Sequence, residues 1–148
     1  DVGVMALHAS RLDAAVAALQ KSVSGKVRFA EAHNNLGIVY AQLGKDDAAA
    51  NHYQRAVELN PHLFSARMNL ANLRLQQEKY QEAVESYRQV QMLKPDFAMA
   101  NYKLGLAYFN QNQWAEAEKE WMRALELKPD FEQAQKALNV VRKKLKSQ

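Results

Sequence analysis

The sequence contains no cysteine, only three prolines and five glycines, and no long apolar run. Without cysteine the chain forms no disulfide, binds no metal through thiolates and uses no cysteine nucleophile. Because a membrane-spanning helix needs about 18 consecutive apolar residues, no membrane insertion is expected. No signal sequence is recognisable either. We therefore expect a soluble protein whose compartment is unknown, since cytoplasm and periplasm are both compatible.

Catalytic motifs are missing as well. The sequence has no phosphate-binding loop, no nucleophile elbow and no zinc motif. Its four histidines share no metal-ligand spacing, so surface or packing roles are expected for His8, His33, His52 and His62. No enzymatic activity, no metal and no cofactor are predicted.

The net charge of +4 is unevenly distributed. Residues 1–131 are balanced, whereas residues 132–148 set Glu132 against five basic side chains, namely Lys136, Arg142, Lys143, Lys144 and Lys146. Such a segment can touch acidic protein, membrane phosphate or nucleic acid. Nucleic-acid-binding proteins usually spread basic residues over a whole binding face. No nucleic-acid partner is therefore expected, and the segment is interpreted as a solvated capping helix.

What the sequence does have is a repeat. Leu36-Gly37 returns as Leu70-Ala71 and as Leu104-Gly105, with a spacing of 34 residues each time. The same frame aligns three further sets of residues, which are Ala49, Ala83 and Ala117, then Tyr53, Tyr87 and Trp121, then Pro61, Pro95 and Pro129. A fixed period of this size indicates an array of structural repeats.

The pattern resembles the tetratricopeptide repeat, with its Trp-x-x-Leu-Gly-x-x-Tyr, Ala-x-x-x-Phe and Pro signature. The Trp position departs in every copy, because it holds His33, Arg67 and Asn101. The resemblance implies an all-α fold, an α-solenoid of antiparallel helix pairs wound into a right-handed superhelix. We predict one domain over residues 1–148, with a partial repeat (1–29), full repeats (30–63, 64–97 and 98–131) and a capping helix (132–148).

Local signals predict where the helices begin and end. In the second copy we expect helices from Ala30 to about Leu43 and from Asp46 to about Leu59. In the first copy only the second helix, about Leu12 to Val23, is complete. A left-handed residue is expected between the two helices of each copy, at Gly44, Glu78 and Asn112. Side-chain capping is expected from Asp96 and Asp130.

The small residues of the frame are predicted to lie where two helices approach most closely. Gly37, Ala71 and Gly105 are expected to face Ala49, Ala83 and Ala117. The aromatic residues of the frame are expected in the next layer of the core.

The resemblance also implies a concave groove lined by the first helix of each repeat. The predicted peptide-binding residues are Asn34, Asn35, Ile38, Gln42, Ser65, Met68, Asn69, Asn72, Gln76, Met99, Tyr102, Lys103, Leu106, Phe109 and Asn110. Asn35, Asn69 and Lys103 share one repeat position, and side-chain amides there can bracket the backbone of an extended peptide. The alternative is that asparagine is merely a soluble residue at this position. Replacing Asn69 by Ala is expected to weaken binding and leave the melting curve nearly unchanged.

A second device of the family is a carboxylate clamp for the acidic tail of a chaperone. The matching positions here are Asn34, Ile38, Asn69, Met99 and Lys103, of which only two fit. Such a clamp is therefore not expected. Met68, Met99, Tyr102 and Phe109 make the far half of the predicted groove apolar and adaptable.

The sequence thus predicts a non-enzymatic protein–protein interaction scaffold that binds an extended peptide or a partner helix. Two alternatives stay open. The chain starts at Asp1 within a repeat, which favours a regulatory or substrate-recruiting segment of a larger enzyme or assembly, such as a glycosyltransferase or an export machine. The apolar residues Val2, Val4, Met5 and Leu7 favour a homo-oligomer formed through the first repeat.

Overall fold

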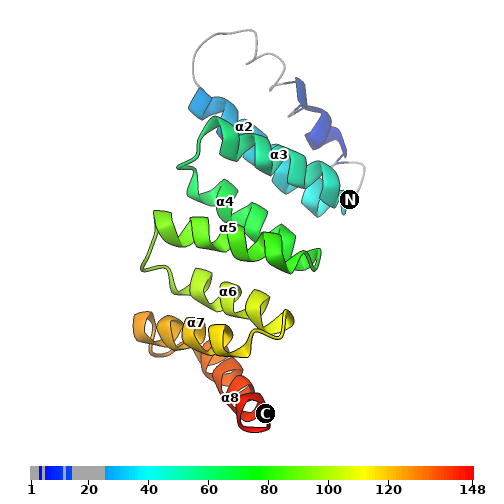
Figure 1. Cartoon of the computed structure of the whole chain (residues 1–148). Helices are drawn as coiled ribbons and strands as arrows, with labels where there is room; N and C mark the ends of the chain where they lie inside the picture. The colour runs from blue at the N-terminus through cyan, green and yellow to red at the C-terminus, as the bar shows by residue number, and fades with distance from the viewer. Residues whose placement is uncertain (1–3, 5, 12, 15–25) are drawn as a thin grey trace. The chain divides into compact units, whose positions relative to one another are not determined.

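The computed structural model describes residues 4, 6–11, 13–14 and 26–148, and their regular structure is entirely helical (Figure 1). The all-α prediction is therefore confirmed for the described part of the chain. The second helix of the first repeat, predicted over about Leu12 to Val23, lies almost wholly outside the described residues. Residues 26–148 form the helices α2 Lys26–Gln42, α3 Asp46–Leu59, α4 Phe64–Gln76, α5 Tyr80–Leu93, α6 Ala98–Asn110, α7 Trp114–Leu127 and α8 Glu132–Lys146.

The first of these helices begins earlier than predicted. Helix α2 starts at Lys26 and not at Ala30, one helical turn upstream. The prediction was wrong because it assumed that this helix begins at the same repeat position as the first helices of the later repeats. Helices α4, α6 and α8 each begin three residues after a proline, at Pro61, Pro95 and Pro129. The segment before Ala30 contains no proline, so nothing there disfavours the helical conformation of the preceding residue.

The turns inside the repeats follow the prediction. Gly44 has φ +75°, and Glu78 and Asn112 have φ +60°. All three are left-handed, which ends one helix and reverses the chain before the next. Left-handed backbone costs a side-chain-bearing residue roughly 1–2 kcal/mol. Glu78 therefore bears a cost that Gly44 avoids.

The predicted side-chain caps are not formed. Helices α6 and α8 have Phe97 and Phe131 at their N-cap positions, and neither helix has a side-chain capping hydrogen bond. The aspartates lie one residue too early to cap. Phe131 is instead buried against Ala124 and Ala134. Packing of this aromatic ring, rather than capping by Asp130, fixes the start of α8.

Contacts between Cα atoms group the chain into two compact units, an N-terminal unit, Asp1–Leu73, and a C-terminal unit, Arg74–Gln148. In the N-terminal unit α2 packs on α3, and Ala49, Tyr53 and Leu70 form a buried core. In the C-terminal unit α5 packs on α6, α6 on α7 and α7 on α8. The single domain predicted over residues 1–148 stays a prediction.

Two of the small residues in the repeat frame, Gly37 and Gly105, lie where no side chain would fit. A Cβ atom added to Gly37 would lie 2.5 Å from the Cδ1 atom of Tyr53, and one added to Gly105 would collide with the indole of Trp121. The two glycines therefore lie against these aromatic rings, which leave no room for a side chain. The predicted contacts of Gly37 and Gly105 with Ala49 and Ala117 stay a prediction.

Candidate functional site

Part of the predicted groove forms a polar network in the N-terminal unit. Asn69 on α4 donates its side-chain amide to Asn34 Oδ1 on α2, with a distance of 3.0 Å between Nδ2 and Oδ1. Asn34 in turn donates from Nδ2 to Ser65 Oγ at 3.3 Å. Asn34 is 7% exposed. Its buried amide is satisfied on both sides, and it links α2 to α4.

This network orients the groups at its edge. Asn69 uses a donor, so its Oδ1 is left as an acceptor. Ser65 accepts through Oγ, so its hydroxyl hydrogen is left to donate. Asn35 is exposed, and no hydrogen bond ties its side chain to another described residue. The structure thus joins Asn69 to Asn34, not to Asn35, the residue at the matching repeat position.

The other predicted residues on α2 and α4 vary in exposure. Ile38 packs against the buried core of the N-terminal unit, whereas Gln42 is exposed. Met68 and Asn72 are half-buried, and Gln76 is exposed.

On α6 the predicted residues have mainly apolar neighbours. Met99 and Tyr102 pack against the core formed by Ala124, Phe131 and Ala134. The rings of Tyr102 and Phe131 lie 5.1 Å apart between centroids. A hollow of about 390 Å³ adjoins Met99, and it is also lined by Asp96, Phe97, Ala98, Leu127, Lys128 and Phe131.

One lysine of the last helix reaches the C-terminal end of α6. Lys144 on α8 lies with its Nζ 5.7 Å from the ring centroid of Phe109 and 5.1 Å from that of Trp114. Asn110 donates its side-chain amide to the carbonyl of Leu106 at 2.8 Å. Lys103 and Leu106 are half-buried. The carbonyl of Tyr102 accepts from the Trp121 indole at 3.0 Å, which ties α7 to α6.

Sequence reasoning missed a histidine pair. His33 and His52 place their Nδ1 atoms 3.1 Å apart, and their rings are stacked. Tyr40 stacks on His52 and donates its hydroxyl to Asp13 at 2.9 Å. Burial lowers the pKa of both histidines, and for His33 the neighbouring His52 lowers it further. Their separation of 19 residues fits no known motif, so no signal in the sequence predicted the pair.

The described residues contain neither a candidate metal-ligand cluster nor a candidate membrane-spanning helix. No cluster of three or more His, Cys, Asp and Glu side chains in that part of the chain could hold a metal ion. Likewise, no described helix is both long and apolar enough to cross a membrane.

Comparison with protein families identifies the architecture. Two profiles described as tetratricopeptide repeat match residues 30–63 and 68–134, which together make up about two thirds of the chain. The chain belongs to the tetratricopeptide repeat family. This membership agrees with the 34-residue period and with the helix pairs seen in the structure.

Solved structures of tetratricopeptide repeat domains resemble the chain closely. The first such domain of Spaghetti (RPAP3), bound to the HSP90 peptide SRMEEVD, matches with 24% identity and a TM-score of 0.76, covering 80% of this chain and 94% of that one. The second domain of human RPAP3, in complex with the HSP70 peptide SGPTIEEVD, matches with 24% identity and a TM-score of 0.75. The match covers 80% of this chain and 98% of that one. YrrB, a TPR protein with an unusual peptide-binding site, matches with 27% identity and a TM-score of 0.69. The match covers 73% of this chain and 56% of that one.

The comparison with curated proteins gave no match.

Proposed function

We propose that this chain is a non-enzymatic protein–protein interaction scaffold in which each unit offers its own binding surface. In the N-terminal unit α2 and α4 bind an extended peptide or a partner helix, and in the C-terminal unit α6 does. The supporting observation is the Asn34–Ser65–Asn69 network of the N-terminal unit. It holds an amide oxygen and a hydroxyl in place one helical turn apart on α4. The exposed Asn35 adds a free amide on α2.

A peptide backbone suits these groups because it alternates donors and acceptors. A Ser65 hydroxyl donates to a peptide carbonyl, and Asn69 Oδ1 accepts from a peptide N–H. Prior ordering by the buried Asn34 reduces the entropy lost on binding. Side-chain amides bind the peptide backbone whatever its side chains are. The polar groups on α2 and α4 therefore provide affinity more than specificity.

In the C-terminal unit, the proposed binding surface is the apolar part of α6. Met99 borders the hollow of about 390 Å³, and Tyr102 packs behind it. Methionine is flexible and polarizable, which lets such a surface adapt to different apolar side chains. A ligand therefore needs at least one apolar side chain for this site.

The ligand differs from those of the RPAP3 domains, whose peptides end in Glu-Glu-Val-Asp. Where a clamp for an acidic tail needs positive charge or amide groups, this chain has Ile38 and Met99. An acidic tail would lose solvation there without gaining an ion pair. The chain should thus bind neutral or mixed peptides in preference to SRMEEVD.

The test is a display selection of random 12-residue peptides on the whole chain, followed by calorimetry with the enriched peptide. Asn35→Ala should weaken binding about fivefold, as loss of one net hydrogen bond does. Asn51→Ala, an exposed asparagine on α3, is the matched control and should change nothing. Equal affinity in wild type, Asn35→Ala and Met99→Ala would overturn the proposal, as would tightest binding of SRMEEVD.

Self-association is a second candidate function. Val4 and Leu7 are 58% and 53% exposed, unusually high values for large apolar side chains. Exposed apolar residues close together mark interaction surfaces. Sedimentation analysis should show a dimer fraction that falls in a Val4→Ser/Leu7→Ser variant. A monomer at all concentrations would contradict it.

A further inference from the structure

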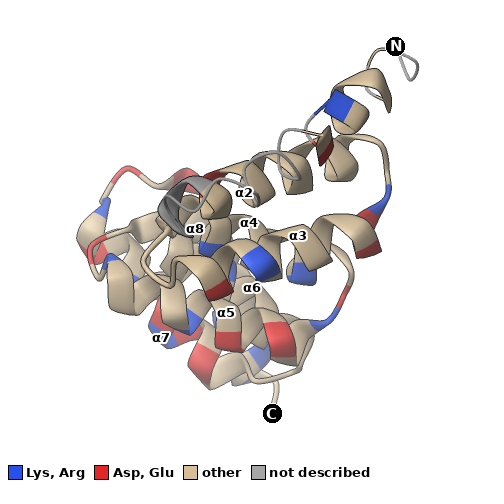
Figure 2. Cartoon of the chain, turned by 90° about the horizontal axis from the view of Figure 1, so that it is seen from above, with Lys and Arg blue, Asp and Glu red and all other residues tan. Residues whose placement is uncertain are grey.

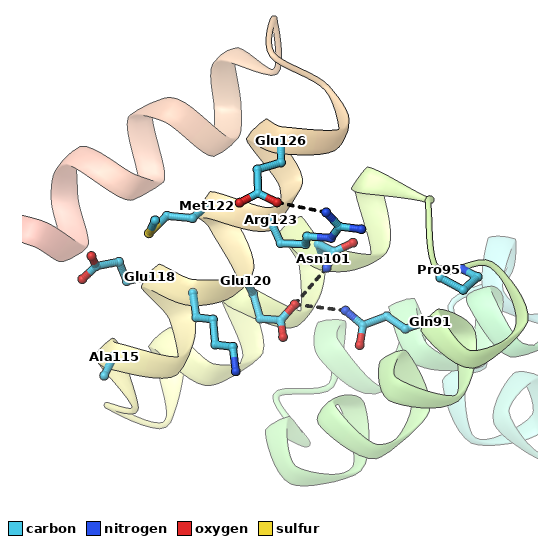
Figure 3. A pocket seen from close by; sticks show the side chains of 10 residues that line it. Gln91, Pro95, Asn101, Ala115, Glu118, Glu120, Met122, Arg123 and Glu126 are labelled. Atoms are coloured by element: carbon cyan, nitrogen blue, oxygen red, sulfur yellow. Dashed lines mark hydrogen bonds and ion pairs between the residues drawn. The ribbon is translucent and has the colours of Figure 1, made fainter.

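A larger pocket lies in the C-terminal unit and contains none of the predicted groove residues. Its volume is about 680 Å³. Most of its wall comes from α7, and α5, α6 and the turn before α6 complete it (Figure 3). The lining residues are Gln91, Pro95, Asn101, Ala115, Glu118, Lys119, Glu120, Met122, Arg123 and Glu126.

The carboxylate of Glu120 is the centre of this pocket. Gln91 on α5 and Asn101 on α6 both donate their side-chain amides to it, each at 3.0 Å (Figure 3). Both donate to the same atom, Oε2. Neither an amide nor a cation among the described residues pairs with Oε1. Glu120 is therefore held in one position and keeps its second oxygen available.

Asn101, which lines the pocket, also has a buried carbonyl. The residue is 4% exposed, and its Oδ1 is buried with no hydrogen-bond partner. A buried carbonyl without a donor is rare and unfavourable. Its dipole is poorly screened because the surroundings have a low dielectric constant. Asn101 is therefore held in the pocket wall by its bond to Glu120, and its carbonyl is not paired with any described donor.

The other acids of the pocket are already neutralised. Glu126 pairs with Arg123 at 2.9 Å, and Glu118 pairs with Arg142 of α8 at 3.6 Å. Lys119 is exposed and can keep its ammonium group in water. Figure 2 shows the same mixture of acidic and basic residues along α5 and α7. Glu120 is thus the carboxylate of the pocket for which the described residues provide no cation.

We propose that this pocket binds a cationic side chain, arginine or lysine, of a partner protein. The cation donates to Glu120 Oε1, while Gln91 and Asn101 hold the carboxylate in place. Pro95, Ala115 and Met122 provide apolar wall for the methylene stem of either side chain. The pocket is a second site, separate from the proposed peptide-binding residues.

The test uses the whole ¹⁵N-labelled chain and small defined probes. N-acetyl-arginine amide and N-acetyl-lysine amide are titrated to millimolar concentration, with the neutral isostere N-acetyl-citrulline amide as the control. The side-chain amide signals of Asn101 and Gln91 should shift with arginine, with lysine or with both, and not with citrulline. The probe with the larger shift identifies the preferred cation. Equal shifts with arginine and citrulline, or no shift with either cation, would overturn the proposal.

Variants then test the carboxylate itself. Glu120→Gln keeps an acceptor for both amides and removes the charge, so it should bind the cation about tenfold more weakly. Glu116→Gln removes the same charge from an exposed position of α7 outside the pocket and should bind as wild type does. Lys119→Gln should bind more tightly, because it removes a like charge. Unchanged affinity in a folded Glu120→Gln variant would also overturn the proposal.

Discussion

The two units share one repeat frame and fill its polar positions differently. The signature's tryptophan position holds His33 in the N-terminal unit, where it stacks on His52. In the C-terminal unit it holds Asn101, which binds the carboxylate of Glu120. All four histidines belong to the first unit and both tryptophans to the second. The repeat frame fixes the helix pairs, while the polar side chains between the helices differ from one unit to the other.

The aromatic residues show the same contrast. Tyr53 lies on Gly37 in the first unit and is tied to α2 by packing alone. Trp121 lies on Gly105 in the second unit and also donates to the carbonyl of Tyr102. The larger ring therefore brings a hydrogen bond between helices that tyrosine does not reproduce.

The largest effect is expected from filling the glycine positions. Gly105→Ala should lower the free energy of unfolding by about 3 kcal/mol and Gly37→Ala by about 2 kcal/mol, at the upper part of the range for overpacking. The first should cost more because it also displaces the indole from Tyr102. Chemical denaturation followed by circular dichroism gives both values. Equal losses would show that the indole hydrogen bond adds nothing to the second unit.

The control for these variants is Gly44→Ala, where an added Cβ meets no atom within 4 Å. This substitution should cost about 1 kcal/mol, from the left-handed backbone alone. A loss as large as that of Gly37→Ala would contradict the assignment of the cost to the aromatic rings.

The polar links between helices come next. Asn69→Ala leaves the buried Asn34 carbonyl without its donor, which typically costs about 1–3 kcal/mol. From the structure we therefore expect Asn69→Ala to lower the melting temperature, where the sequence alone predicted a nearly unchanged melting curve. Asn35→Ala should leave it unchanged, because Asn35 is exposed and outside the network. A thermal melt in which both variants match wild type would show that the Asn34–Asn69 bond does not stabilise the first unit.

The sequence predicted the frame well because the period reports backbone geometry. Turn chemistry predicted the left-handed residues Gly44, Glu78 and Asn112, and helix length predicted the bounds of α3. The contacts of Asn34, His33 and Glu120 depend on which rotamer each side chain adopts between two helices. The repeat frame aligned Asn35 with Asn69 but could not show that Asn34, about 100° away around the helix, is the residue that Asn69 contacts. A pocket around Glu120 needed residues from three helices at once, which no local pattern contains.

A smaller effect on stability is expected from pH, and it should differ between the two units. Folding lowers the pKa of His33 and His52 below the ordinary value of 6.5, since His33 is buried and His52 half-buried. Protonation then favours the unfolded chain, so stability is complete above about pH 6.5 and falls as the pH drops below it. Amide hydrogen exchange at pH 7.5 and 5.5, corrected for intrinsic rates, should show lower protection in α2 and α3 at pH 5.5. Helices α6 and α7 contain no histidine and should keep their protection.

A double variant tests the origin of this pH effect. His33→Gln/His52→Gln should remove the difference in protection of α2 and α3 between the two pH values. His62→Gln, at an exposed position, should preserve it. Asp13, Tyr40 and Arg55 also act on this pair, and the double variant leaves all three in place. A pH effect that survives in the double variant would assign it to groups outside the histidine stack.

The smallest effect on stability is expected at the left-handed turn residues, Gly44 and Glu78. Gly44 occupies the left-handed position in the first unit, whereas Glu78 bears the cost of the same conformation in the second. Glu78→Gly relieves a steric cost of roughly 1 kcal/mol but adds entropy to the unfolded chain, so a net gain of about 0.5 kcal/mol is expected. Glu78→Ala keeps the steric cost and is the matched control for loss of the carboxylate. If both variants are equally stable, the turn geometry is not what limits the second unit, and the difference between Gly44 and Glu78 has no energetic meaning.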